Sequence, residues 1–231
     1  MKTIGLIGGL SWESTVEYYR LLNESVKAKL GGLHSAKILL YSFDFAEIEA
    51  LQHQGDWDQA TELMIEAAQK LETGKADCVL ICSNTMHKMA DAVQANINIP
   101  LLHIADPTAK KIVARGFYKI GLLGTRFTME QEFYKGRLTD KYGLEVVIPN
   151  QQDVELVHNI IYQELCLGKV ESVSKNCYKQ IIETLVSQGA EAIVLGCTEI
   201  MLLVQQADSA VPLFDTTAIH AEAAVDYAIQ G

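Results

Sequence analysis

Short apolar runs alternate along the chain with longer segments in which apolar residues recur every three or four positions. The runs predict β-strands at residues 3–7, 36–42, 77–82, 100–104, 118–123, 144–148, 191–196 and 212–214. The longer segments predict helices at residues 13–30, 44–52, 56–73, 109–114, 128–142, 152–167, 170–188, 198–206 and 216–230, with another after residue 85. Apolar strands that alternate with helices are typical of parallel sheets covered by helices. The pattern therefore predicts an α/β fold with sites at the carboxyl ends of the strands.

Three sequence elements occur twice. IGLIGG at residues 4–9 returns as IGLLGT at residues 120–125, and CVLICSNT at residues 78–85 parallels AIVLGCTE at residues 192–199. IPLL at residues 99–102 parallels VPLF at residues 211–214. The repeats predict two similar lobes, each a parallel sheet flanked by helices. We expect the first lobe to comprise residues 1–104 and 210–231, with the last helix returning to it, and the second to comprise residues 105–209.

Composition narrows the classes of partner. The 231 residues are 49% hydrophobic and carry a formal charge of −10, which argues against nucleic acid or an anionic membrane as a partner. No apolar run approaches the roughly 18 residues of a membrane span, and the first residues lack the pattern of a signal peptide. The five cysteines include no CxxC pair, which is typical of a reducing compartment, so we expect a cytoplasmic protein. The six scattered histidines predict no metal site.

Cys197 is the strongest candidate for a reactive group. It follows Gly196, which allows close approach of a substrate, and it precedes a predicted helix. Unpaired N–H groups at a helix start favour an anion, so we expect the pKa of this thiol to lie below its ordinary value of about 8.5. The alternative is a buried small apolar residue, which is how we interpret the other four cysteines.

Ser83, Asn84 and Thr85 follow the equivalent strand of the first half. Their amide and hydroxyl groups can hold a carboxylate or an amine. The alternative is that Ser83 or Thr85 caps the next helix, and both roles are compatible, because the capped N–H groups would also receive an anion. His87 lies just inside that helix, where we interpret it as an orienting group rather than a base.

The glycine-containing turns at residues 8–12 and 124–128 each follow a first strand. Neither has the GxGxxG pattern, and no acid follows at the spacing that a ribose needs, so dinucleotide binding is not predicted. A carboxylate bound by backbone N–H groups and threonine hydroxyls fits better. The alternative is simple strand-to-helix geometry.

Taken together, these motifs resemble the cofactor-independent aspartate/glutamate racemase family over the whole chain. The motifs are GGLSWES at residues 8–14, SNTMHK at 83–88, LGTRFTME at 123–130 and GCTEI at 196–200. The resemblance implies two homologous lobes related by a pseudo-two-fold axis with the active site between them. It also implies a homodimer, an acidic amino acid as the small-molecule substrate, and no cofactor.

By resemblance, the catalytic pair is Ser83 and Cys197, which would remove and return the α-proton on opposite faces. The family generally has Cys-Asn-Thr where this chain has Ser83, and the neighbouring Cys82 would face the other side of its strand. A serine is a poor base without an activating partner. Three interpretations follow: a racemase that favours one enantiomer, a weakened enzyme, or an engineered replacement. We favour the first, because a threonine occupies this position in the L-specific branch.

The same resemblance implies the residues that bind the substrate. Asn84, Thr85 and Thr198 would hold the α-carboxylate, while the Leu10 backbone N–H, Gln52, Arg126 or Thr128 would reach the distal carboxylate. Glu164 would meet the ammonium group, although an exposed position is the alternative for both Gln52 and Glu164. Glu199 completes the set, and it replaces the histidine of the glutamate racemases that serve peptidoglycan synthesis.

Three alternatives remain open. The chain also resembles hydantoin racemases, maleate isomerases and arylmalonate decarboxylases, and the last of these need only one thiol. It could instead be a silent protein that binds an acidic amino acid. A thiol oxidoreductase is disfavoured, because no resolving cysteine lies near Cys197 in the sequence. The choice between aspartate and glutamate is left open.

Overall fold

Parallel strands form one sheet in each of two units of the chain. The computed structural model describes residues 1–230, and its contacts divide them into a first unit, residues 1–104 and from His220 onward, and a second unit, Ala105–Ile219. The predicted α/β fold, with two parallel sheets flanked by helices, is confirmed. Within residues 1–230 we find no helix with both the length and the apolar character needed to cross a membrane.

In the first unit, strand β1 (Ile4–Gly8) lies between β2 (Ile38–Ser42) and β3 (Cys78–Ile81). The strand predicted at residues 100–104 is reduced to a single bridge between Leu101 and Val79. Val79 donates to the Pro100 carbonyl over 2.9 Å, and Leu102 donates to the Val79 carbonyl over 2.9 Å. The chain then leaves for the helix that begins at Ala105, so the ladder stops after this bridge.

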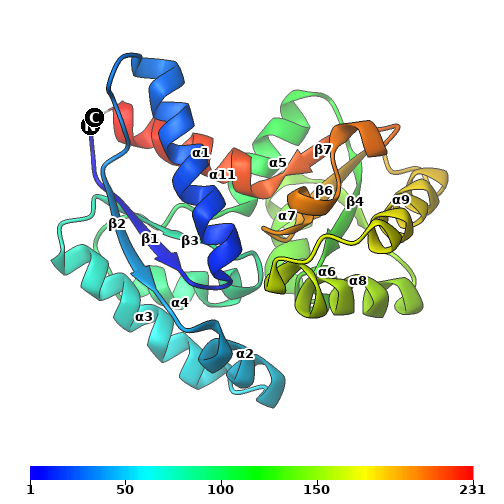
Figure 1. Cartoon of the computed structure of the whole chain (residues 1–231), viewed down its shortest axis with the longest axis horizontal. Coiled ribbons are helices and arrows are strands. Elements are labelled where there is room, and N and C mark those ends of the chain that lie inside the picture. Colours follow the sequence, from blue (N-terminus) through cyan, green and yellow to red (C-terminus); the bar gives the residue numbers. More distant parts are fainter. Residues whose placement is uncertain (231) are drawn as a thin grey trace. The chain divides into compact units, whose positions relative to one another are not determined.

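Helices cover both faces of this first sheet (Figure 1). One face packs against α1 (Trp12–Leu30) and α11 (Thr216–Ile229), and the other against α2 (Phe45–Gln54), α3 (Trp57–Thr73), the 3-10 helix η1 (Thr85–Met89) and α4 (Ala90–Ala95). Successive side chains of a strand point to opposite faces of the sheet, so each face packs into its own hydrophobic core.

Helix α3 illustrates how the sequence specifies these elements. The Asp56 side chain caps its first turn by accepting from the Gln59 N–H over 3.1 Å. Its buried residues follow the predicted apolar stripe: Ala60, Met64, Ala67, Ala68 and Leu71.

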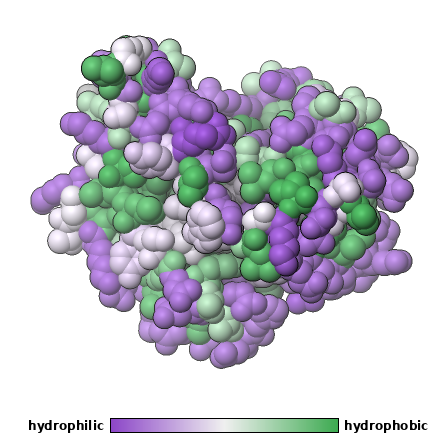
Figure 2. Space-filling model, in the orientation of Figure 1, coloured by the Kyte–Doolittle hydropathy of each residue, from purple (hydrophilic) through white to green (hydrophobic). Residues whose placement is uncertain are grey.

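The first unit also exposes apolar side chains. Trp12, Val16 and Tyr19 lie on one stripe of α1 and are 66%, 53% and 60% exposed. Leu40 of the edge strand β2 is 51% exposed, and Figure 2 shows apolar residues gathered at the surface over this strand.

In the second unit the strand order is β5 (Glu145–Val147), β4 (Lys119–Gly124), β6 (Ala192–Gly196) and β7 (Leu213–Asp215). The helices are α5 (Ala105–Ala114), α6 (Arg126–Glu130), α7 (Glu132–Tyr142), α8 (Gln151–Gln163), η2 (Leu165–Leu167), α9 (Ser172–Ser187), α10 (Ile200–Leu203) and η3 (Gln206–Asp208). The helix predicted at residues 128–142 is broken at Gln131, whose backbone is extended, and the one predicted at 198–206 is reduced to the four residues of α10.

The repeated motifs occupy equivalent positions in the two sheets. IGLIGG forms β1 and IGLLGT forms β4, and each is the strand next to the one that carries the second repeat. Ile193 donates to the Pro212 carbonyl over 2.9 Å, which repeats the bond between Val79 and Pro100. The two similar sequences therefore form the same hydrogen bond between neighbouring segments in each unit.

The return to the first unit lies later than the predicted residue 210. Residues 210–219 belong to the second unit, because β7 pairs with β6 through Ile193 and Leu213. The Thr216 hydroxyl also donates to the Leu195 carbonyl over 2.8 Å. Helix α11 therefore begins in the second unit and continues in the first from His220 onward.

Candidate active site

Two glycines position Cys197 at the carboxyl end of β6. Gly124 of β4 and Gly196 of β6 are partners in the ladder. A Cβ atom on Gly124 would lie 2.6 Å from the Gly196 carbonyl oxygen, and one on Gly196 would lie 2.9 Å from the Leu123 carbonyl oxygen. Only glycine allows the two strands to approach this closely, so the backbone that delivers Cys197 depends on both residues.

The Cys197 thiol is paired with a carboxylate. Its Sγ donates to Oε2 of Glu199 over 2.9 Å, and the Thr198 hydroxyl donates to the same oxygen over 2.9 Å. All three side chains are buried. The structure thus brings together three of the predicted site residues, and Glu199 accepts hydrogen bonds from the other two.

Burial raises the pKa of Cys197 well above its ordinary value, and the negative charge of Glu199 raises it further. The predicted lowering by a helix start was wrong. Helix α10 begins only at Ile200 and has four residues, so its dipole is small, while the carboxylate lies within hydrogen-bond distance. Cys197 is therefore a neutral thiol at neutral pH and must give up its proton before it can act as a base.

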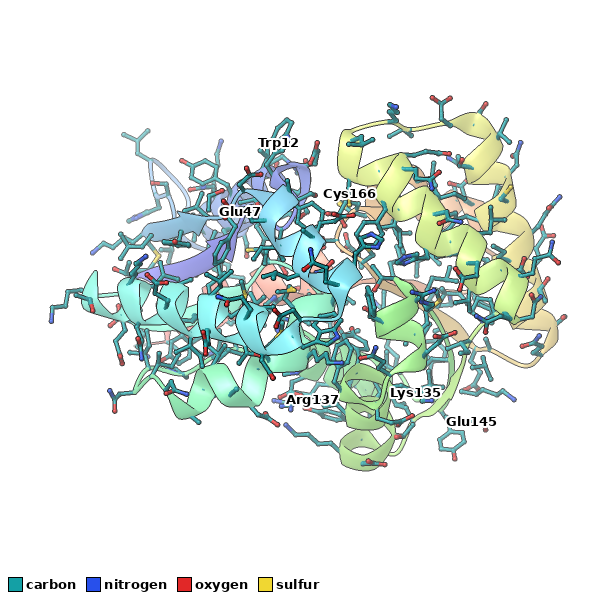
Figure 3. All side chains as sticks on the ribbon, turned by 90° about the horizontal axis from the view of Figure 1, so that it is seen from below. Trp12, Glu47, Lys135, Arg137, Glu145 and Cys166 are labelled. Atoms are coloured by element: carbon teal, nitrogen blue, oxygen red, sulfur yellow. The ribbon has the colours of Figure 1, made fainter. Side chains whose placement is uncertain are left out.

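Tyr178, Cys166 and Glu164 are linked to this cluster electrostatically, and the first two were not predicted to be functional. The fully buried Tyr178 hydroxyl of α9 interacts electrostatically with Cys197, Glu199, Cys166 and Glu164, and all four raise its pKa. Glu164 ends α8 and is half-buried rather than exposed, with its Oε2 atom inaccessible to solvent. Cys166 (Figure 3) also raises the pKa of Cys197, so a second thiol lies nearby although it is distant in the sequence.

Tyr178 has a weak sequence signal. It lies on the buried stripe of α9 with Ile181, Ile182 and Leu185, so the pattern indicates core packing. The one clue is that a tyrosine replaces an aliphatic residue there, because a buried tyrosine hydroxyl usually needs a polar partner.

In the first unit, Ser83, Asn84 and Thr85 follow β3 and are buried. The Ser83 Oγ accepts from the Met86 N–H of the first turn of η1 over 3.4 Å, although the residue at the N-cap of η1 is Asn84 rather than Ser83. Gln52 is 4% exposed and donates to the Met86 sulfur over 3.1 Å, which excludes the alternative of a surface glutamine. Leu10 packs in the same core cluster as Met86.

His87 contacts the Ser83 backbone rather than its hydroxyl. Its Nδ1 lies 2.7 Å from the Ser83 carbonyl oxygen, and its Nε2 accepts from the Ile104 N–H over 3.1 Å. These partners assign the proton to Nδ1, because Nε2 must keep its lone pair. A ring held in this way orients the chain at Ser83 and is not directed at the hydroxyl proton.

Thr128 and Arg126 lie at the start of α6. Thr128 is fully buried, its hydroxyl is 3.2 Å from that of Thr125, and its Cβ and Cγ2 fill the space beside Gly124 and Gly196. The Arg126 guanidinium forms an ion pair with Glu155 at 3.1 Å. Thr128 thus packs against the glycine pair that precedes Cys197. Arg126 is paired with a carboxylate of its own unit.

The two cysteines of the first unit lie in its hydrophobic core. Cys78 and Cys82 pack in the core cluster that contains Tyr18 and Leu22, and burial raises the pKa of Cys78 to about 12 and that of Cys82 still further. Cys82 therefore faces away from the side that Val79 and Ile81 occupy, as predicted. Among residues 1–230, no group of three or more His, Cys, Asp or Glu side chains could hold a metal ion.

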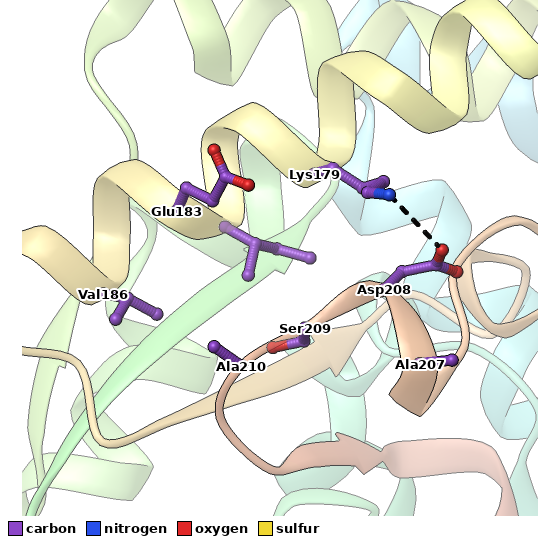
Figure 4. A pocket seen from close by; sticks show the side chains of 8 residues that line it. Lys179, Glu183, Val186, Ala207, Asp208, Ser209 and Ala210 are labelled. Carbon is purple, nitrogen blue, oxygen red and sulfur yellow. Dashed lines mark ion pairs between the residues drawn. The ribbon is translucent and has the colours of Figure 1, made fainter.

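A groove of about 440 Å³ lies elsewhere in the second unit, between α9 and the segment around η3 (Figure 4). Its polar lining includes Lys179, Glu183 and Asp208, with Lys179 3.9 Å from Asp208. Val186 and Ala210 line it just before β6 and β7 begin. The groove is thus at the amino ends of these strands and contains none of the predicted site residues.

Comparison with known proteins finds a matching family model and similar structures over most or all of the chain. The family model for Asp/Glu/hydantoin racemases matches residues 7–224. A crystal structure from Yersinia pestis, provisionally designated an Asp/Glu racemase, is 58% identical over 100% of both chains, with a TM-score of 0.92. An aspartate racemase homologue from Pyrococcus horikoshii OT3 is 36% identical, over 99% of this chain and 100% of that one, with a TM-score of 0.85.

A further relative is a protein whose name states an enzymatic activity. The broad-specificity amino-acid racemase RacX of Bacillus subtilis (strain 168) is 28% identical over 172 residues, which cover 74% of this chain and 73% of the relative. The family match spans both sheets and includes β3, β6 and the polar segments that follow them. The chain therefore belongs to the Asp/Glu/hydantoin racemase family.

Proposed function

We propose that this protein is a cofactor-independent racemase of aspartate or glutamate that removes the α-proton on one face and returns a proton on the other. The observation that carries the proposal is the buried Cys197 thiol, which lies at the end of a parallel strand and donates to Glu199 over 2.9 Å. A thiol paired with a proton acceptor is the pattern of an activated acid–base group.

The proposed reaction begins with a proton transfer inside the second unit. The Cys197 S–H bond breaks, and its proton forms an O–H bond with Oε2 of Glu199. The Cys197 thiolate then takes the α-proton, so that the substrate Cα–H bond breaks and the S–H bond forms again. The Ser83 hydroxyl gives its proton to the carbanion on the other face. Exchange with water removes the proton from Glu199 and restores the one on Ser83.

Charge stabilisation in this proposal comes from neutral donors. The carbanion spreads its charge into the α-carboxylate, so donors placed at that group lower the barrier. We assign Asn84, Thr85 and Thr198 to the α-carboxylate, Leu10, Gln52 and Thr128 to the distal end of the substrate, and Glu164 to its ammonium group. All of these side chains are buried or half-buried, where such interactions are strongest.

The Ser83 hydroxyl makes the proposed reaction unequal in its two directions. Ser83 can donate a proton, but it is a weak base, because an alcohol releases its proton far less readily than a thiol. The enantiomer whose α-proton faces Cys197 should therefore exchange faster. His87 does not offset this difference, because its ring contacts the Ser83 carbonyl.

Proton NMR in D2O with each enantiomer of aspartate and glutamate tests the proposal. We expect loss of the α-proton signal for at least one amino acid, faster from one enantiomer, with circular dichroism reporting the opposite enantiomer as it forms. The proposal fails if none of the four compounds exchanges its α-proton while calorimetry shows that they bind. That result would support the silent binding protein instead.

Replacing Ser83 by Cys should speed the direction in which residue 83 is the base. A thiolate is accessible where an alkoxide is not, so we expect the slow enantiomer to gain about 10²-fold, the lower end of the effect of a positioned proton-transfer group. Initial rates of exchange from both enantiomers measure the change. Cys82→Ala is the control, because Cys82 faces the core and its loss should not alter the ratio of the two rates. An unchanged ratio in Ser83→Cys would remove residue 83 from proton transfer.

A decarboxylase of small dicarboxylic acids is the second candidate. The specific observation in its favour is that the predicted catalytic pair contains a single thiol, Cys197, and a serine, because protonation of one carbanion face needs only one acid. Release of carbon dioxide from an arylmalonate, without exchange of the amino-acid α-proton, would favour it.

We also propose that the protein is a homodimer, as the family resemblance implies, and that it is cytoplasmic, as the cysteine content indicates. Sedimentation tests whether the protein is a dimer, and fractionation of the source cell tests whether it is cytoplasmic.

A further inference from the structure

Two buried histidines of the first unit bind the same short segment, residues 102–104. Nε2 of His220 on α11 lies 2.7 Å from the Leu102 carbonyl oxygen, and Nε2 of His87 on η1 accepts from the Ile104 N–H over 3.1 Å. The two rings also contact each other, with their centroids 5.9 Å apart. Both side chains are buried. Helices α11 and η1 therefore fix one stretch of backbone through their histidine side chains.

This segment needs side-chain partners because the sheet ends before it. Leu101 forms a single bridge with Val79, and the next helix begins at Ala105. Buried backbone groups are almost always hydrogen-bonded. The Leu102 carbonyl and the Ile104 N–H lie between the bridge and the helix, and each is bonded to a histidine ring. The histidines thus hold the segment where the ladder no longer does.

The partners of His220 determine where its ring carries the proton. A carbonyl oxygen can only accept, so Nε2 donates to Leu102 and keeps its hydrogen. Nδ1 is then an acceptor, and the Tyr18 hydroxyl of α1 donates to it over 2.8 Å. Tyr18 is itself fully buried. Its hydroxyl therefore favours the tautomer in which His220 can bind the segment.

The same segment is connected to Ser83 through His87. Ile104 binds Nε2 of that ring, while Nδ1 donates to the Ser83 carbonyl oxygen over 2.7 Å. The Ser83 Oγ has a longer contact, 3.4 Å, with the Met86 N–H. A hydrogen bond of that length is weak, so the place of the hydroxyl follows largely from the backbone that carries it.

We propose that His220 is a positioning residue for Ser83, which it holds through residues 102–104 and His87. This inference rests on the proposed function, in which the Ser83 hydroxyl gives its proton to the carbanion. His220 thereby acts on the return of the proton and not on its removal by Cys197. Its loss should leave the carbanion forming while fewer of the carbanions are protonated from the face of Ser83.

The two fates of the carbanion separate these effects. We start in D2O from the enantiomer whose α-proton faces Cys197. The thiol that has taken the α-proton exchanges it with the solvent, so a deuteron returned by Cys197 labels the substrate and keeps its configuration. A deuteron from the Ser83 hydroxyl inverts the configuration. The ratio of inversion, by circular dichroism, to total exchange, by proton NMR, does not depend on how much of the protein is folded.

Replacing His220 by Leu should lower this ratio about fivefold, the effect of losing one neutral hydrogen bond. His220→Gln should restore most of it, because the glutamine amide can donate to Leu102 in place of Nε2. Val225→Ala is the control for lost stability. Val225 is fully buried on the same helix and packs in the same core cluster as Tyr18, but its side chain makes no hydrogen bond. It should leave the ratio unchanged.

Equal ratios in His220→Leu and Val225→Ala would overturn the proposal, and so would a ratio in His220→Gln as low as in His220→Leu. The unmodified protein provides a test that needs no folded variant. Two-bond ¹H–¹⁵N correlation spectra should show the ring of His220 protonated on Nε2 and that of His87 on Nδ1. A proton on Nδ1 of His220 would contradict the proposal, because Tyr18 could then no longer donate to that nitrogen.

The outcome is separable from that of the proposed function. Amide hydrogen exchange at Ile104 needs no substrate, and the amides of β1 report the stability of the same unit. Relative to β1, Ile104 should exchange about fivefold faster in His220→Leu, because the amide loses one neutral bond's worth of protection, and at the original rate in Val225→Ala. That result without any α-proton exchange would support the connection and reject the racemase. Racemisation with equal Ile104 rates would do the reverse.

Discussion

Replacing Cys197 by Ser is expected to reduce α-proton exchange by about 10²–10⁴-fold for both enantiomers of the substrate. In the proposed cycle Cys197 is the base for one enantiomer and the acid for the other, and a hydroxyl is a far weaker base than a thiolate. The buried position and the Glu199 carboxylate would disfavour an alkoxide further. Proton NMR in D2O, started separately from each enantiomer, measures both losses.

Cys177→Ser is the matched control for this variant. Cys177 lies on helix α9, is partly exposed, and is not among the main groups that raise the pKa of Cys197. It should exchange at the rate of the unmodified protein. Exchange that survives in Cys197→Ser would remove the thiol from the mechanism, and with it the central step of the proposal.

Replacing Glu199 by Gln should have two effects of opposite sign. The carboxylate raises the pKa of Cys197, so a neutral amide should lower that pKa and increase the thiolate fraction at neutral pH. Alkylation of Cys197 should therefore become faster. Turnover should nevertheless fall by about 10²-fold, because the amide cannot receive the proton that leaves the sulfur during the reaction.

Measuring both quantities in one variant separates reactivity of the thiol from catalysis. Glu183→Gln is the control, because Glu183 lies on the same unit, lines the surface groove and has no ion pair among the described residues. It should change neither rate. Slower alkylation in Glu199→Gln would show that Glu199 does not hold the thiol in its neutral form, and full turnover would show that another group takes the proton.

Much of the fold was predictable because it is encoded in local patterns. The repeated strands, the glycines at Gly124 and Gly196 and the stripe of α3 follow from side-chain periodicity and from space that only hydrogen can occupy. Helix ends and sheet edges were less predictable. The short α10 and the single bridge at Leu101 depend on where the chain must go next, which no local pattern records.

The candidate site also has features that the sequence predicts and features that it does not. Ser83 and Cys197 were identifiable because each stands where an apolar run stops, and the motifs around them resemble one family. The acid–base state of Cys197 was not identifiable, because its pKa depends on how deeply the sulfur is buried and on how the neighbouring Glu199 side chain is turned toward it in the fold. The sequence predicted a lowered pKa from a helix start, whereas the carboxylate of Glu199 and the burial of the sulfur produce the opposite.

Tyr178 shows the same limit most clearly. In the sequence it is one more large residue on the inner stripe of α9 with Ile181 and Ile182, and only its hydroxyl group distinguishes it from them. In the folded second unit, burial and the charges of Cys197, Glu199 and Glu164 raise the pKa of its hydroxyl. The order of residues thus determined which elements form and which strand end carries the candidate thiol Cys197. Folding alone determined how deeply that thiol is buried and which groups from distant parts of the chain, such as Cys166, act on it, because electrostatic interactions depend on distance in space.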